Sequence, residues 1–253
     1  YVKPEGFFVS IQNCWNDPLI GEIVGPDRAL GCVASHIEVA LWEPGHVNRG
    51  GEPGRDHGHT VFRVGEHNGT ITPKSEKVAA MLDRIDAAYA SDNLWGERWS
   101  KLCQNSMGNA ISAMSAMGSQ DLAKDPRTRL FRIHLAKEGC QVGLAQGLNV
   151  VDVSAKSAQM WANADQGDVF EELDDFLGSR GGNVNWLASM AQDVHKGRHS
   201  EIDFMNGLIS RKGREVGVPT PYNDAIIEAM HGIDDGSIKP GPATIDQIMK
   251  DVG

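Results

Sequence analysis

Trp99-Ser-Lys-Leu-Cys-Gln-Asn-Ser-Met-Gly-Asn109 is the stretch of this sequence that best reveals its organisation. It places Lys101, Asn105 and Asn109 at positions i, i+4 and i+8 of a predicted helix that runs from about residue 96 to residue 117. Residues four apart share one helix face and climb about 6 Å per step, so the three polar groups would line one wall of a groove.

Apolar side chains flank this polar row on several sides of the predicted helix, namely Trp95, Trp99, Leu102, Met107, Ile111 and Met114. The pattern predicts that the segment is buried, where three polar groups without partners would cost free energy. The alternative is a solvated stripe, since lysine and asparagine are usually exposed. We interpret the row as a surface that binds a small molecule.

Length and charge exclude several classes of protein. The chain has 253 residues, enough for one large domain or two ordinary ones, and a formal net charge of −10. That charge argues against nucleic-acid binding, which depends on clustered lysine and arginine at the phosphates. No apolar run approaches the ~18 residues that a membrane span needs. The sequence therefore predicts a soluble protein without nucleic-acid or membrane partners.

The cysteines and histidines give no strong signal for a metal. Four cysteines lie far apart, which favours reduced thiols in the cytoplasm over a zinc knuckle or a disulfide scaffold. Asp56-His-Gly-His59 has two histidines close together, but no third ligand is fixed nearby, so we expect no metal site.

The first 72 residues are rich in predicted strands. Phe7–Ile11 is typical of a buried strand in a parallel sheet, with further strands over 29–39, 47–49 and 60–64 and a short helix over 17–24. Ligands collect where such strands end, which makes Asn13 a candidate contact, although an asparagine there is often only a turn residue.

From Thr72 onwards the pattern is helical, with Pro73 at a first helical position. Helices are predicted at about 75–89, 96–117, 126–147, 153–164, 168–178, 184–196, 200–216, 223–231 and after Pro242. We therefore expect two domains, a strand-containing domain over 1–72 and an all-helical domain over 73–253.

The motifs of several enzyme classes are missing. Gly-x-Ser-x-Gly, the phosphate-binding Gly-x-x-x-x-Gly-Lys and His-Glu-x-x-His do not occur, and neither does the dinucleotide fingerprint Gly-x-Gly-x-x-Gly. A second polar cluster, Asn185 to Asp193, is followed by Gly197 to Gly207. In the second of these stretches, Glu201 is either a functional carboxylate or an acid that stabilises the start of a helix.

Four motifs in this order resemble the ketopantoate reductase (2-dehydropantoate 2-reductase) family. They are Ile11-Gln-Asn13, Trp99-Ser-Lys101-x-x-x-Asn105-x-x-x-Asn109, Ser189-Met-x-Gln-Asp193 and Gly197-Arg-x-x-Glu201-Ile-Asp-x-x-Asn206-Gly207. The resemblance implies a Rossmann-type α/β domain followed by an all-α domain, and reduction of 2-dehydropantoate with NADPH. It also implies that the chain starts at the later strands of the Rossmann domain, with the glycine-rich loop upstream of Tyr1.

The resemblance assigns roles to single residues. Lys101 matches the catalytic lysine of the family. Glu201 matches an acidic residue near the nicotinamide and the reacting centre, which makes it a second catalytic candidate that either orients Lys101 or binds a substrate hydroxyl. Asn13 matches the asparagine at the junction of cofactor and substrate. The other matches are substrate-binding positions, namely Asn105, Asn109 and Ser189.

Ser119 departs from the family pattern, because pantoate-specific enzymes can have a substrate-binding asparagine there. The segment from about 154 to 185 is also longer than in compact members. These two departures predict a preference for a 2-oxo acid other than ketopantoate.

The expected chemistry follows from these groups. Hydride delivery to a ketone builds negative charge on its oxygen, which Lys101 could protonate as general acid in a cleft between the two domains. The alternatives are a dehydrogenase of a different hydroxy acid and a non-catalytic helical binding module on the same scaffold. A small-molecule 2-oxo acid is the expected partner, and a homodimer is left open.

Overall fold

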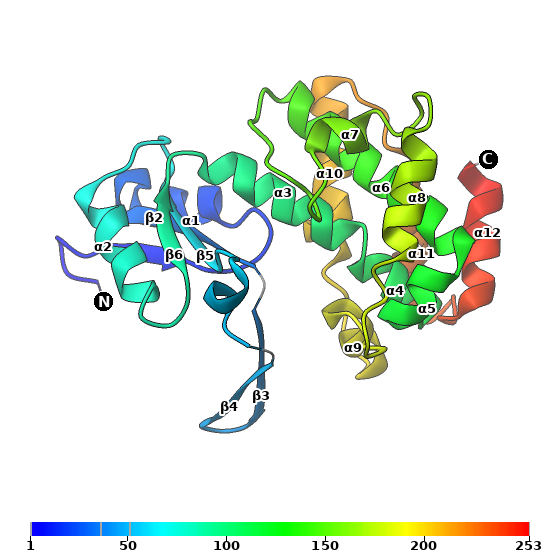
Figure 1. The fold of residues 1–253 in the computed structure, drawn as a ribbon, viewed down its shortest axis with the longest axis horizontal. Coiled ribbons are helices and arrows are strands. Elements are labelled where there is room, and N and C mark those ends of the chain that lie inside the picture. The colour runs from blue at the N-terminus through cyan, green and yellow to red at the C-terminus, as the bar shows by residue number, and fades with distance from the viewer. Residues whose placement is uncertain (1, 36, 51, 253) are drawn as a thin grey trace. The chain divides into compact units, whose positions relative to one another are not determined.

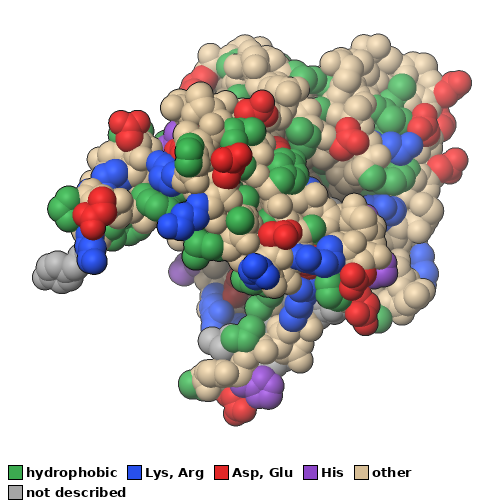
Figure 2. Space-filling model, turned by 60° about the vertical axis from the view of Figure 1, so that its left-hand side comes forward, with side chains coloured by type: hydrophobic (Ala, Val, Ile, Leu, Met, Phe, Trp, Pro, Cys, Tyr) green, Lys and Arg blue, Asp and Glu red, His purple; other side chains and the backbone are tan. Residues whose placement is uncertain are grey.

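The computed structural model describes residues 2–35, 37–50 and 52–252, so predictions for Tyr1, His36, Gly51 and Gly253 lie outside the described residues. The chain forms two compact units, Tyr1–Lys101 and Leu102–Gly253, which we describe separately (Figure 1). On the face in Figure 2, lysine and arginine side chains lie among aspartate and glutamate side chains.

The first unit contains strands, helices and short 3₁₀ turns. Its elements are β1 (Phe8–Ser10), α1 (Asp17–Val24), a 3₁₀ turn (Pro26–Arg28), β2 (Ala29–Ala34), β3 (Glu38–Glu43), β4 (His46–Gly50), a second 3₁₀ turn (Gly54–His57), β5 (Phe62–Glu66), α2 (Pro73–Leu82), β6 (Ala88–Ser91) and α3 (Leu94–Ser106), which continues into the second unit.

Four of the strands form a mixed sheet in the order β1-β2-β5-β6, and β3 pairs with β4 as an antiparallel hairpin. β1 is parallel to β2, β2 is antiparallel to β5, and β5 is parallel to β6. The predicted parallel strand near Phe7–Ile11 is thus confirmed. Its predicted burial is wrong, because β1 lies at an edge of this sheet and Phe8 stays 40% exposed.

Helix α2 begins as predicted and ends early. Thr72 and Ser75 form a capping box, and Pro73 occupies the first turn. The predicted continuation to residue 89 is wrong because α2 ends at Leu82 and residues 88–91 form β6. Between them Asp86 is buried and accepts hydrogen bonds from the backbone N–H groups of Gly54 (2.8 Å) and Arg55 (2.9 Å), which hold the turn that leads into β6.

Two glycines let α3 begin directly on the sheet. Gly31 of β2 pairs with Gly65 of β5, and the buried Leu94 lies over both. A Cβ on Gly31 would come within 2.6 Å of Leu94 and of the Asp17 carboxylate, and one on Gly65 within 2.7 Å of Leu94. Because glycine has no side chain, these two positions leave room for the first turn of α3 to pack on the sheet.

A tryptophan cluster covers another side of α3. The ring of Trp15 lies 4.8 Å from that of Trp95 and 5.5 Å from that of Trp99, between ring centroids. The indole N–H of Trp95 donates to the carbonyl of His67 at 2.9 Å. The loop after β1 is thereby packed against the helix that carries Lys101.

The division between the units falls at Lys101 and Leu102, later than the expected boundary at 72/73. The reason is that α2 packs on β5 and β6, and β6 completes the sheet. Residues 73–93 thus belong with the strands, and among the described residues only the part of the chain after α3 is all-helical.

The second unit is a helical assembly. Its elements are the end of α3, α4 (Asn109–Ser115), α5 (Ser119–Lys124), α6 (Pro126–Ala145), α7 (Ala158–Ala162), α8 (Val169–Gly178), α9 (Ser189–His195), a 3₁₀ turn (Ile202–Phe204), α10 (Asn206–Val216), α11 (Pro221–Asp234) and α12 (Pro242–Val252). The long helix α6, whose Asp125 cap accepts from the N–H of Arg127, packs against α7, α8, α10 and α11. In the part of the chain that the structure describes, no helix is long and apolar enough to cross a membrane.

The predicted helices of this unit differ in how well they match. Those at 126–147, 168–178 and after Pro242 are confirmed as α6, α8 and α12. The predictions at 153–164 and 184–196 are too long, and α5 was not predicted. The predicted helix over 96–117 is two helices, because Met107 and Gly108 form a turn between α3 and α4.

Candidate functional site

Lys101 lies on α3 and is half-buried. Its burial lowers the pKa of the ammonium below its usual value, and the positive charge of Arg63 lowers that pKa further. Among the described residues its Nζ has no hydrogen-bond or ion-pair partner. A lysine in this state can give up its proton more readily than a solvated one.

Buried Arg98 fixes the turn of α3 that precedes Lys101. Its guanidinium pairs with the fully buried Asp17 at 2.8 Å and donates to the carbonyl oxygens of Ser10, at 2.9 Å, and of Gln12. Asn13 follows directly, with an exposed side chain and a carbonyl that accepts from Asn16 at 2.7 Å. The structure thus ties the loop that bears Asn13 to α3, and Asn13 is also a turn residue.

The expected single row of Lys101, Asn105 and Asn109 is wrong in its last member. Lys101 and Asn105 lie one turn apart on α3, but Asn109 begins α4 after the turn at Met107 and Gly108. Asn105 and Asn109 are both half-buried, and the Asn109 amide contacts the Met205 sulfur at 3.8 Å.

A buried hydrogen-bond network holds the end of α3, just before the turn at Met107 and Gly108. The side-chain amide of Asn206 donates to the carbonyl of Ser106 at 3.2 Å and to Asn223 at 2.9 Å. Asn223 donates to the carboxylate of Glu138 at 2.7 Å, and so does the backbone of Tyr222 at 2.9 Å. Burial raises the pKa of the Glu138 carboxyl to about 7, although the hydrogen bonds from Tyr222 and Asn223 lower it. The end of α3 is thereby linked to α6, α10 and α11.

Ser189 and Glu201 lie on the surface of the second unit. Ser189 is the exposed first residue of α9, which packs on α4, the helix that Asn109 begins. Glu201 is exposed just before the 3₁₀ turn, and its carbonyl accepts from the Phe204 N–H at 3.0 Å. Within the described ranges the Glu201 carboxylate forms no hydrogen bond or ion pair with Asn105, Asn109 or Ser189.

Ser119 has a structural partner. Its hydroxyl donates to the carbonyl of Val184 at 3.0 Å, and the N–H of Gln120 donates to the Asn185 side chain at 2.9 Å. These bonds fasten the segment before α9 to the start of α5.

Sequence patterns did not reveal Arg63, Glu97, Glu138 or Asn223 as part of the surroundings of the site. Arg63 and Glu97 form an ion pair at 2.8 Å, although they lie far apart in the sequence. A buried acid within an apolar helix face, as at Glu138, is the one signal that could have drawn attention to this group.

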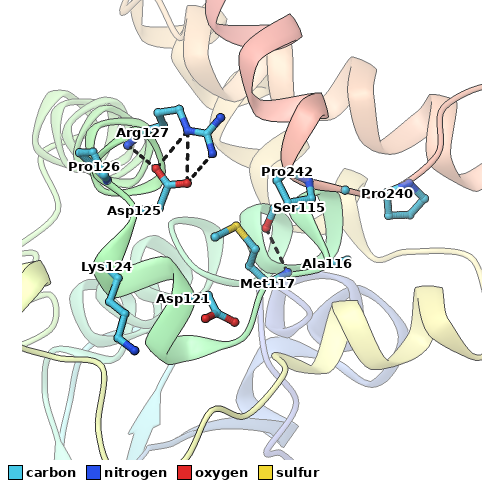
Figure 3. A pocket seen from close by; sticks show the side chains of 11 residues that line it. Ser115, Ala116, Met117, Asp121, Lys124, Asp125, Pro126, Arg127, Pro240 and Pro242 are labelled. Carbon is cyan, nitrogen blue, oxygen red and sulfur yellow. Dashed lines mark hydrogen bonds and ion pairs between the residues drawn. The ribbon is translucent and has the colours of Figure 1, made fainter.

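Two open pockets lie in the second unit, and neither is lined by the candidate residues. The larger, about 830 Å³, is bounded by the end of α4, α5 and the starts of α6 and α12 (Figure 3). The Asp125–Arg127 pair stands at its rim, opposite Pro242. In the stretches that the structure describes, no group of three or more potential metal ligands occurs, and Asp56 and His57 lie in a 3₁₀ turn.

Solved structures share this fold across nearly the whole chain. A ternary complex of D-mandelate dehydrogenase with NADH and anilino(oxo)acetate superposes with a TM-score of 0.74 at 22% identity, covering 93% of this chain and 70% of that one. The PanE/ApbA family ketopantoate reductase from Ralstonia eutropha has a TM-score of 0.68 at 23% identity, covering 90% and 66%. These likenesses define the fold class, a Rossmann-type α/β unit followed by an all-α unit.

Residues 93–234, more than half of the chain, match the family described as ketopantoate reductase PanE/ApbA C terminal. The chain therefore belongs to the ketopantoate reductase family. It is 26% identical to a 2-dehydropantoate 2-reductase of Archaeoglobus fulgidus over 191 residues, 72% of this chain and 58% of that protein. A Pyrococcus horikoshii 2-dehydropantoate 2-reductase is 27% identical over 234 residues, 90% of this chain and 68% of that protein.

Proposed function

We propose that this chain is part of a nicotinamide-dependent reductase of a 2-oxo acid, 2-dehydropantoate or a related compound, with NADPH as the reductant. The observation that carries the proposal is Lys101, a half-buried ammonium with a lowered pKa, one turn from Asn105 on α3. Family membership and relatives named 2-dehydropantoate 2-reductase support it.

In the proposed reaction Lys101 is the general acid. The ketone carbon gains a hydride, and the Lys101 Nζ gives a proton to the ketone oxygen, so that the product is a neutral hydroxyl and the amine is left neutral. Before that transfer the ammonium stabilises the negative charge that grows on this oxygen. Asn105, Asn109 and Ser189 bind the substrate through amide and hydroxyl groups that add no competing charge.

A nicotinamide cofactor, when bound, supplies the hydride. The exposed Asn13 fits such a group, because its amide follows the carboxyl end of β1 and can both donate and accept a hydrogen bond to a carboxamide. We propose that Glu201, an exposed carboxylate of the second unit, binds near the nicotinamide or holds a substrate hydroxyl.

The test is a panel of 2-oxo acids assayed with NADPH and with NADH by loss of reduced-nicotinamide absorbance. The panel contains 2-dehydropantoate, smaller aliphatic acids and aryl acids, since the Ser119 hydroxyl donates to a backbone carbonyl at the position where pantoate-specific enzymes can have a substrate-binding asparagine. We expect reduction of at least one acid, with one other than ketopantoate preferred. No turnover and no cofactor binding by the full-length protein would instead favour a helical binding module.

We also propose a cellular location and an oligomeric state for the protein. All four cysteines are buried, and reduced thiols of this kind fit a cytoplasmic location, which we propose. A solved Staphylococcus aureus ketopantoate reductase is described as dimeric, with a TM-score of 0.66 at 18% identity, covering 92% of this chain and 69% of that one. We propose a homodimer, which light scattering would test.

A further inference from the structure

An ion pair between Arg63 and Glu97 involves the face of α3 that carries Lys101. Arg63 projects from β5, with its Nε 2.8 Å from a Glu97 carboxylate oxygen and its Nη1 donating to Ser35 at 3.0 Å. The other Glu97 oxygen accepts from the hydroxyls of Tyr89, at 2.9 Å, and Ser91, at 2.8 Å. The Glu97 side chain is 5% exposed and that of Arg63 is 20% exposed. Both charges are therefore held in place.

Lys101 shares this face because it follows Glu97 by four residues on a continuous helix, a climb of about 6 Å. The ammonium responds to Arg63, whose charge adds to burial in lowering the pKa of Lys101. Lys101 and both members of the pair lie within the first unit.

Other titratable groups lie close to the pair in the described part of the first unit. Tyr89 of β6 is neutral near neutral pH, because burial and the Glu97 charge raise the pKa of its phenol. Arg98 is balanced by Asp17, and Asp92, in the turn before α3, adds to the burial that raises the pKa of Glu97. Among the described residues Arg63 and Glu97 form an ion pair with each other, so removing either side chain leaves the other charge without that partner.

We infer that Arg63 and Glu97 are positioning residues for Lys101: Arg63 holds a positive charge against its turn of helix, and Glu97 limits how far that charge reaches. This inference rests on the proposed function of Lys101 as proton donor. Too much positive charge would leave the lysine neutral at working pH and without a proton to give, whereas too little would make it a weak acid.

The size of the effect follows from Coulomb's law. At an effective dielectric constant of about 20, one unbalanced charge roughly 6 to 10 Å from an ammonium lowers or raises its pKa by ~1–2. Glu97→Gln keeps the shape but leaves Arg63 unbalanced, so the pKa of Lys101 should fall. Arg63→Gln removes the positive charge and leaves Glu97 unbalanced, so the pKa of Lys101 should rise. The double variant should return towards the wild-type value, and Glu97→Asp should restore it in part.

The experiment measures the pKa of Lys101 directly, by NMR titration of the full-length protein with ¹³C-labelled lysine, assigned through Lys101→Arg. Glu76→Gln, an exposed acid on α2, is the control for loss of one negative charge. Opposite shifts in the two single variants, absent from the control, support the inference whether or not a 2-oxo acid is reduced. If either single variant fails to fold, the other and the double variant give the same comparison.

Equal titration of Lys101 in wild type, Arg63→Gln and Glu97→Gln would overturn the inference. If the enzyme is active, the alkaline limb of its kcat against pH should move in the same order as the NMR values. A limb that stays fixed while the NMR values move would remove Lys101 as the proton donor and leave the charge coupling intact, so the two failures are distinguishable.

Discussion

Lys101 could be singled out from the sequence because its spacing to Asn105 and the family motif are both local. Its electrostatic surroundings could not, since Arg63 reaches Glu97 only after β5 and α3 have packed together. Glu138 is a similar case, because its partner Asn223 lies 85 residues away in the sequence. Local patterns identify a reactive group, whereas the charges that tune it come from long-range contacts.

Replacing Lys101 with alanine should lower kcat by about two orders of magnitude or more, the usual scale for loss of a general acid. Folding should be unaffected, because α3 is fixed through Leu94 and Arg98 instead. Steady-state kinetics and circular dichroism would measure both effects. Lys77→Ala, an exposed lysine on α2, is the matched control, and unchanged turnover in Lys101→Ala would refute the role.

Glu138→Gln should change how stability depends on pH. Between the ordinary value of 4.5 and about 7 the folded chain keeps a proton on Glu138 that the unfolded chain has released. The free energy of unfolding should therefore fall with rising pH across this window, by up to ~1.4 kcal/mol per pH unit, and this slope should vanish in the variant.

Urea unfolding at several pH values measures that slope. The matched control is Glu171→Gln, an exposed acid on α8, which should keep the wild-type pH dependence. Parallel curves for wild type and Glu138→Gln would show that this carboxyl does not hold its proton in the folded state.

Among the elements, α6 could be predicted from its Asp125-Pro126 start, where Asp125 caps the helix, and α8 from its amphipathic spacing after Gly167. The turn between α3 and α4 could not, because Gly108 alone does not end a helix and the anchors of the turn, Asn206 and Met205, lie far along the chain. Strand β6 was missed for a related reason. It has only four residues, Ala88–Ser91, and the pairing with β5 makes them a strand.

Gly31→Ala should destabilise the first unit, because a Cβ there meets Leu94 and the buried Asp17 at 2.6 Å. Overpacking of this kind costs about 1–3 kcal/mol. Gly241→Ala is the control, since a Cβ at Gly241 meets nothing within 4 Å. Thermal unfolding of the two variants decides the point, and equal melting temperatures would mean that α3 can shift at no cost.

At the scale of the whole molecule, the sequence predicted an α/β part followed by a helical part, and the comparisons confirm that fold class. The change in composition near Thr72 marks where strands become sparse. It does not mark where packing divides, because α2 covers the sheet and β6 extends it.

Because the chain forms two compact units, we expect a destabilising substitution to affect mainly the unit in which it lies. Hydrogen exchange read by mass spectrometry should show Gly31→Ala raising exchange in peptides from 2–101, and Glu138→Gln changing the pH dependence of exchange in peptides from 102–252. Changes in both ranges for both variants would show that the units unfold as one.

The tryptophan cluster gives the first unit an optical signature. Indole rings whose centroids lie 4.8 Å apart, as in Trp15 and Trp95, couple their electronic transitions and produce an exciton band in circular dichroism. Trp161 of the second unit lies 6.5 Å from the ring of Phe176 instead. The band therefore reports, without any label, whether the loop that bears Asn13 is seated on α3.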